Sequence, residues 1–76
     1  MYEVVVRRAG SPVEVTHVYE DAHAAYAARL AIVVQLRRMG WRGQRNAAGV
    51  WRMWRGAFRR DRIAIRVLKL ESFGLN

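Results

Sequence analysis

The chain has 76 residues, a formal net charge of +8 at pH 7 and no cysteine. Its length suits one domain with a small core, and its 53% hydrophobic content argues against intrinsic disorder. Because cysteine is absent and the only histidines are His17 and His23, neither a disulfide framework nor a thiolate or structural zinc site is expected.

The first 19 residues predict two strands joined by a turn. Residues 2–8 are rich in valine and alternate loosely, and residues 13–19 alternate again between two faces. Residues 9–12 read Ala-Gly-Ser-Pro, in which glycine permits positive φ and proline lacks a backbone donor. The pattern therefore predicts a β-hairpin.

A helix is predicted to begin at Glu20 and Asp21 and to end at Gly40. Acidic residues in the first turn complement the helix dipole, aspartate is a favoured N-cap, and the alanine-rich run that follows has high helix propensity. Arg37 and Arg38 fall in the last turn, before a glycine stop. At about 100° per residue, the expected core face collects Ala22, Ala25, Tyr26, Ile32, Val33, Leu36 and Met39.

Arg29 is the unusual residue of this helix, because it falls near the middle of the expected apolar face. One explanation is that its aliphatic stem runs along the sheet edge while the guanidinium reaches out. The other is that the true core face is rotated towards Leu30 and Val34.

The second half of the chain predicts two more strands. Residues 41–49 have little periodicity and contain two glycines, which predicts a loop. Residues 50–55 and 62–70 predict strands, with a basic connection at 56–61. The order ββαββ predicts an α+β fold, in which a four-stranded, mainly antiparallel sheet carries one helix packed on one face. Residues 71–76 are expected to form a loose tail.

One helix covers one face of such a sheet, so the other face is expected to be open. On the last predicted strand, Arg62 and Arg66 lie opposite the apolar face. On the strand before it, Trp51 and Trp54 point to opposite faces. At least one of these tryptophans is therefore expected to be partly exposed.

The positive charge is concentrated in one part of the chain. Ten of the 14 basic residues fall between Arg37 and Arg66, with Asp61 as the one acid among them. A one-sided cationic surface attracts polyanions over about 8 Å at physiological salt. The predicted partners are nucleic acid or an acidic protein surface. The predicted binding residues are Arg37, Arg38, Arg42, Arg45, Arg52, Arg55, Arg59, Arg60, Trp51 and Trp54.

Two kinds of partner fit this composition. Proteins that bind single strands stack bases on aromatic rings while cations follow the backbone, and residues 51–55 interleave tryptophan and arginine in this way. An exposed tryptophan flanked by arginine is equally typical of a protein–protein hot spot. Around the loop that carries Arg42 and Arg45, glycines would let the backbone approach a phosphate. The sequence leaves both kinds of partner open.

Catalysis is not expected. His17 and His23 have no serine, cysteine or paired carboxylates placed to form a triad, and the carboxylates are scattered rather than clustered as a metal site requires. We expect a protein without enzymatic activity, metal or cofactor. A small ribonuclease that depends on His17 or His23 is the remaining catalytic hypothesis.

The chain is expected to be a single domain over residues 1–76, monomeric and cytoplasmic, without membrane contact. The N-terminus lacks the basic region and long apolar run of a signal peptide. The longest apolar stretch, Leu30 to Val34, is too short to span a bilayer.

Residues 37–41, Arg-Arg-Met-Gly-Trp, resemble the helix–glycine–aromatic segment of small toxin ribonucleases with a double-stranded-RNA-binding-like fold. Those enzymes carry a Gly-Ser-His signature after this segment. Here residues 46–51 read Asn-Ala-Ala-Gly-Val-Trp, so the catalytic histidine is missing and the resemblance does not imply the activity.

In size, polarised charge and element order, the whole chain resembles phage-encoded anti-CRISPR proteins directed at type I surveillance complexes. Those proteins bind the effector complex and obstruct its contact with target DNA. The resemblance implies an inhibitor in the host cell that docks its basic Arg/Trp face on an acidic patch of an effector subunit. No motif defines the group, so no residue is assigned by it. The alternative is a phage or plasmid protein that binds duplex DNA or RNA directly.

Overall fold

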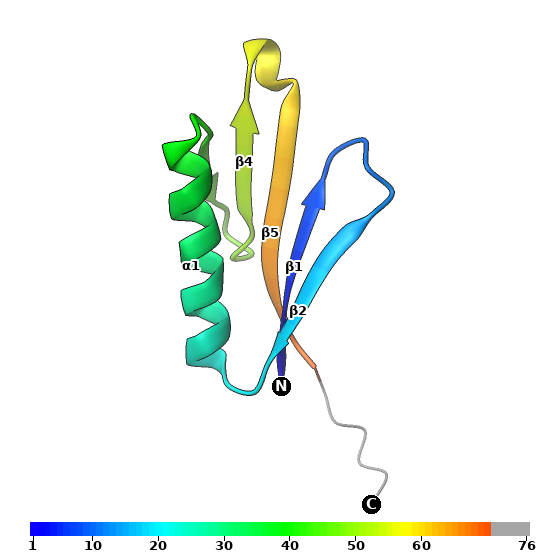
Figure 1. Cartoon of the computed structure of the whole chain (residues 1–76), viewed down its shortest axis with the longest axis vertical. Coiled ribbons are helices and arrows are strands. Elements are labelled where there is room, and N and C mark those ends of the chain that lie inside the picture. Colours follow the sequence, from blue (N-terminus) through cyan, green and yellow to red (C-terminus); the bar gives the residue numbers. More distant parts are fainter. Residues whose placement is uncertain (71–76) are drawn as a thin grey trace, which may run out of the picture.

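The computed structural model of the chain describes residues 1–70 and places one helix against one face of a five-stranded sheet (Figure 1). The strand order across the sheet is β2-β1-β5-β4-β3, and every neighbouring pair is antiparallel. The elements are β1 Tyr2–Arg8, β2 Glu14–Tyr19, α1 Ala22–Arg38, β3 Arg42–Arg45, β4 Trp51–Arg55, a short 3-10 turn η1 Ala57–Arg59 and β5 Asp61–Lys69. The predicted tail at 71–76 lies outside the described residues.

The α+β class and the single helix on one face are confirmed, but the predicted number of four strands is wrong. Residues 41–49 were expected to form a loop, yet Arg42–Arg45 is a strand that pairs with β4. Its sequence, Arg-Gly-Gln-Arg, has neither the β-branched residues nor the alternation that mark a strand. Pairing with β4, rather than local propensity, makes this segment extended.

Both predicted ends of α1 are confirmed by their capping bonds. At the start, Asp21 Oδ1 accepts a hydrogen bond of 2.8 Å from the backbone N–H of Ala24. At the end, Gly40 has φ of 93° and donates to Arg37 O, while the N–H of Trp41 donates to Leu36 O. These two bonds form a Schellman motif, in which glycine supplies the left-handed residue. The motif also turns Trp41 back into the core.

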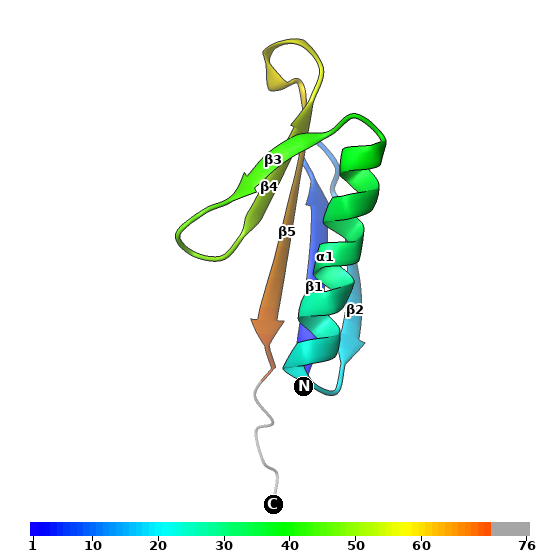
Figure 2. The same ribbon diagram turned by 90° about the vertical axis from the view of Figure 1, so that its left-hand side faces the viewer.

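The hydrophobic core lies between α1 and the inner face of the sheet. Because strand side chains alternate, the residues that face α1 are every second one along each strand. Figure 2 shows α1 in front of one side of the sheet, with the β3–β4 hairpin extending past it. The buried core cluster is Val4, Ala25, Val33, Trp41, Met53 and Ile65.

The core face of α1 differs from the predicted one. Tyr26 and Met39 were expected to be core residues, but they are 47% and 57% exposed. Leu30 and Val34 are exposed as well, so the face is not rotated towards them. Ala25 and Val33 are buried as predicted, and the predicted Ile32 and Leu36 pack partly buried against the core. The third buried residue of α1 is Arg29.

Arg29 ties α1 to the turn between β3 and β4. Its side chain is only 9% exposed, and Nη1 donates a hydrogen bond of 2.9 Å to the backbone oxygen of Gly49. The guanidinium also lies 4.8 Å from the ring centroid of Tyr26. Burial lowers the pKa of Arg29, but a guanidinium still stays charged at neutral pH. This cation is therefore structural and is not part of any exposed surface.

Gly43 has a packing role on the inner face of β3. A Cβ atom at this position would collide with the sulfur of Met53 and with the backbone oxygen of Arg52. Met53 is almost completely buried, so it has no free space to move into. The glycine that the sequence associated with a phosphate approach is thus required for β3 to lie against the core.

The substitution Gly43→Ala is expected to lower the free energy of unfolding by about 1–3 kcal/mol, the usual cost of overpacking a core. Urea denaturation followed by tryptophan fluorescence measures this change. The matched control is Gln44→Ala, because Gln44 is exposed on the same strand and its loss should cost no more than about 0.5 kcal/mol. Equal stability of the two variants would contradict the packing role.

Candidate functional site

The face of the sheet that points away from α1 carries a group of aligned arginines. Arg42, Trp54 and Arg62 lie opposite one another on β3, β4 and β5. Directly opposed residues on antiparallel strands have Cβ atoms about 4.5–5.5 Å apart. These side chains therefore form one continuous row.

A second row runs beside the first. Arg52 on β4 lies opposite Ala64 on β5, which in turn lies opposite Arg7 on β1. Arg66 follows two residues further along β5 on the same face. We call this surface the open arginine face, and its strand arginines are Arg7, Arg42, Arg52, Arg62 and Arg66.

The connection between β4 and β5 adds Arg59 to this face. Its guanidinium lies 4.3 Å from the ring centroid of Trp54, the shortest of the cation–π contacts found in residues 1–70. Trp54 itself is half-buried. Stacking on the ring holds the cation at the edge of the open arginine face while its N–H groups remain free to bind an acceptor.

Residues of both rows line an open hollow of about 670 Å³. Arg7 and Arg52 flank Ala64, whose small side chain leaves space between the two longer ones. No aspartate or glutamate of the described chain lines this hollow. Its lining includes Arg7, Arg52, Arg59, Arg62, Trp54 and Phe58.

A second hollow of about 390 Å³ also borders the β4–β5 connection. Arg42 and Arg55 line it, and Trp54, Phe58 and Arg59 line both hollows. The two hollows therefore meet at this connection, and arginine side chains line both of them.

Asp61, the one acid in the basic part of the chain, is engaged on the inner face. Its carboxylate accepts a hydrogen bond of 2.8 Å from Arg8 Nη2 and lies 3.7 Å from Arg55 Nη2. Both guanidinium groups also approach the ring of Trp41, at 5.9 Å for Arg8 and 4.8 Å for Arg55. The carboxylate therefore neutralises inner-face arginines and not those of the open arginine face.

Most of the open arginine face lacks carboxylate partners. One further ion pair of residues 1–70 joins Arg7 and Glu14 at 3.7 Å. The remaining arginines of this face have no carboxylate of the described residues within 4.0 Å. Their positive charges add up over one surface and favour an anionic ligand.

The structure divides the predicted site residues between two faces. Four of the ten, Arg42, Arg52, Trp54 and Arg59, lie on or beside the open arginine face. On the helix side, Trp51 lies 5.3 Å from the guanidinium of Arg37 and opposite Arg45. Arg55 is on this side as well, Arg38 is exposed at the end of α1, and Arg60 lies at the β4–β5 tip.

Both tryptophans of β4 are half-buried on opposite faces, so the expectation that at least one is partly exposed is confirmed. The predicted set omitted Arg7, Arg62 and Arg66. The alternation of β5 in the sequence already placed Arg62 and Arg66 opposite the apolar face. Arg7 gave no such signal, because it joins them only through the pairing of β1 with β5.

No known protein family, no curated protein and no solved structure matches the chain. Among residues 1–70, no group of three or more histidine, aspartate or glutamate side chains is placed to hold a metal ion. In the same residues, no helix has the length and apolar character needed to cross a membrane.

The ion pair of Asp61 predicts a pH dependence. The hydrogen bond from Arg8, with the nearby charge of Arg55, lowers the pKa of Asp61 below its ordinary value. A carboxyl whose pKa is lower in the folded state stabilises the fold above about pH 4, its unfolded pKa, and loses this effect as pH falls through the folded pKa.

The free energy of unfolding of the native chain is thus expected to exceed that of Asp61→Asn at pH 7, and the difference is expected to shrink below about pH 4. Urea denaturation of both proteins from pH 7 to below about pH 4 measures this difference in the free energy of unfolding. The other carboxyls are present in both proteins, so their contributions to the difference cancel. A difference that stays constant down to strongly acidic pH would contradict the assignment.

Proposed function

We propose that the chain is a non-catalytic nucleic-acid-binding protein whose open arginine face contacts the phosphate backbone. The observation that carries this proposal is the arginine-lined hollow, in which Arg52, Arg59 and Arg62 have no carboxylate partner among residues 1–70. An arginine fork donates two parallel hydrogen bonds to phosphate oxygens, which makes it well suited to a repeated phosphate ligand.

The spatial spread of the arginines favours a polymer over a small anion. They occupy β1, β3, β4, β5 and the β4–β5 connection, so they extend across most of the sheet. A single phosphate or carboxylate would engage one or two of them. A nucleic-acid backbone presents one charge after another, and each neutralised phosphate releases counterions.

Charge reversal at the hollow tests this function. The double variant Arg52→Glu/Arg62→Glu is expected to weaken binding of fluorescently labelled DNA or RNA by on the order of tenfold or more at physiological salt. Anisotropy titrations at several salt concentrations should also show a log–log slope that is shallower by about 1.4 for single strands or 1.8 for duplex.

The matched control is Arg38→Glu/Lys69→Glu, which changes the net charge equally. Arg38 is exposed at the end of α1, and Lys69 lies opposite Tyr2 on the helix side of β5. The affinity of this control variant for the labelled nucleic acid is expected to stay close to that of the native chain. If both double variants lose affinity to the same extent, binding follows total charge and the open arginine face is not the site.

The second candidate function is the anti-CRISPR inhibitor expected from the resemblance. Its supporting observation is that Phe58 is fully exposed beside Trp54 and Arg59, a composition typical of protein–protein hot spots. It predicts saturable binding to a type I effector complex and inhibition of its target-DNA binding. Absence of nucleic-acid binding by the free chain at physiological salt would favour this candidate over the first.

A further inference from the structure

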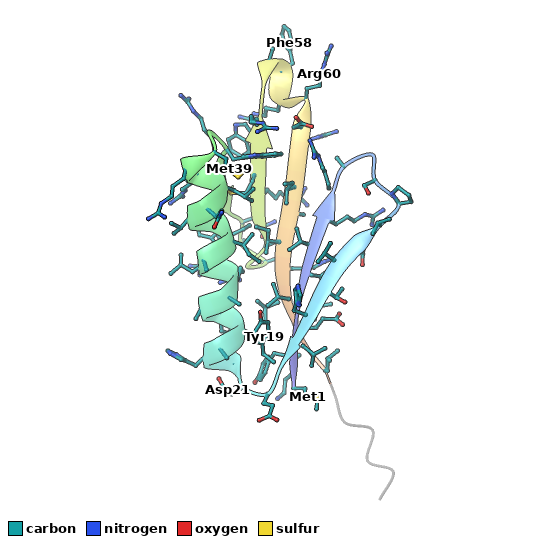
Figure 3. All side chains as sticks on the ribbon, in the orientation of Figure 1. Met1, Tyr19, Asp21, Met39, Phe58 and Arg60 are labelled. Carbon is teal, nitrogen blue, oxygen red and sulfur yellow. The ribbon has the colours of Figure 1, made fainter. Side chains whose placement is uncertain are left out.

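Phe58 is the most exposed large apolar side chain of residues 1–70. It lies at the tip of the β4–β5 connection, at one extreme of the long axis of the molecule, and points away from the sheet (Figure 3). Arg59 and Arg60 follow it directly. The Phe58 ring is surrounded by solvent, so it contributes nothing to the hydrophobic core. Core packing therefore does not explain why an aromatic residue stands at this tip.

The backbone at this tip is held in an uncommon conformation. Phe58 and Arg59 both have positive φ, at 59° and 54°, a region that residues with a Cβ atom seldom occupy. For Arg59, the cation–π contact with Trp54 offsets part of the conformational cost. For Phe58 no packing contact does so, because the side chain is fully exposed. Strained residues of this kind gather at sites that bind ligands.

The position of Phe58 links the tip to the arginine-lined surface. Phe58 borders both hollows, together with Trp54 and Arg59. A backbone whose phosphates pass from one hollow to the other would therefore bring its bases close to the Phe58 ring. In a duplex the base faces are stacked inside the helix, whereas a single strand presents them freely.

We propose that Phe58 stacks on an unpaired base and that the nucleic acid bound by the open arginine face is single-stranded. This inference rests on the function proposed above and names its ligand class. The arginines supply attraction for the backbone, and the phenylalanine supplies the preference for an unpaired base.

The test compares Phe58→Ala with the native chain on a labelled oligothymidylate and on a DNA duplex. The affinity for the single strand is expected to fall by about 5- to 150-fold, the usual effect of losing one base–aromatic stack. The affinity for duplex and the salt dependence of both complexes are expected to stay unchanged, because no charge is altered. Phe58→Trp is the conservative variant and is expected to retain single-strand affinity.

A direct readout of stacking is the fluorescence of 2-aminopurine placed in the single strand. The native chain and Phe58→Trp are expected to change this fluorescence on binding, and Phe58→Ala is not. Urea denaturation of the three proteins checks their folding, which the removal of a fully exposed side chain should not disturb.

Two outcomes would overturn this inference while leaving the proposed function intact. One is unchanged single-strand affinity in Phe58→Ala when Arg52→Glu/Arg62→Glu binds weakly. The other is an equal loss on duplex and single strand, which would make Phe58 a wedge between base pairs. If the native chain binds neither nucleic acid at physiological salt, the proposed function fails together with the inference.

Discussion

β1 and β5 pair along the whole length of β1, from Tyr2 opposite Lys69 to Arg8 opposite Ile63. This ladder joins the first and last strands of the described chain and connects the β1–β2 hairpin to the β3–β4–β5 part of the sheet. On one face it brings Val4 beneath α1. On the other face it places an arginine of β1 beside those of β5. Core and candidate site therefore depend on the same ladder.

The two faces of this sheet use arginine in different ways. On the helix side, Arg29, Arg37 and Arg55 lie over aromatic rings, and Arg55 shares the carboxylate of Asp61. These contacts neutralise or stack the cations and stabilise the packing of α1 and Trp41. On the open side, most of the guanidinium groups lack such partners among residues 1–70. The difference separates structural arginines from those available to a ligand, although all of them look alike in the sequence.

Local signals predicted the helix, its two caps and four of the strands, because each depends on residues close together in the chain. They missed β3, whose extended form comes from pairing with β4, and they placed Tyr26 in the core because helical periodicity does not show that Arg29 is held there by Gly49. One arginine of the candidate site, Arg7, was equally hidden. Alternation assigned residues to faces within one strand, but only the strand order brings Arg7 to the hollow.

The order in which the strands are synthesised gives the sheet a further property. β5 lies at the centre of the strand order but comes last in sequence among the elements of residues 1–70. Until β5 is synthesised, the β1–β2 hairpin and the β3–β4 hairpin have no strand between them that pairs with both. Contacts so distant in sequence slow folding. The open arginine face, which combines arginines of β1, β3, β4 and β5, is therefore complete only after β5 has paired with both hairpins.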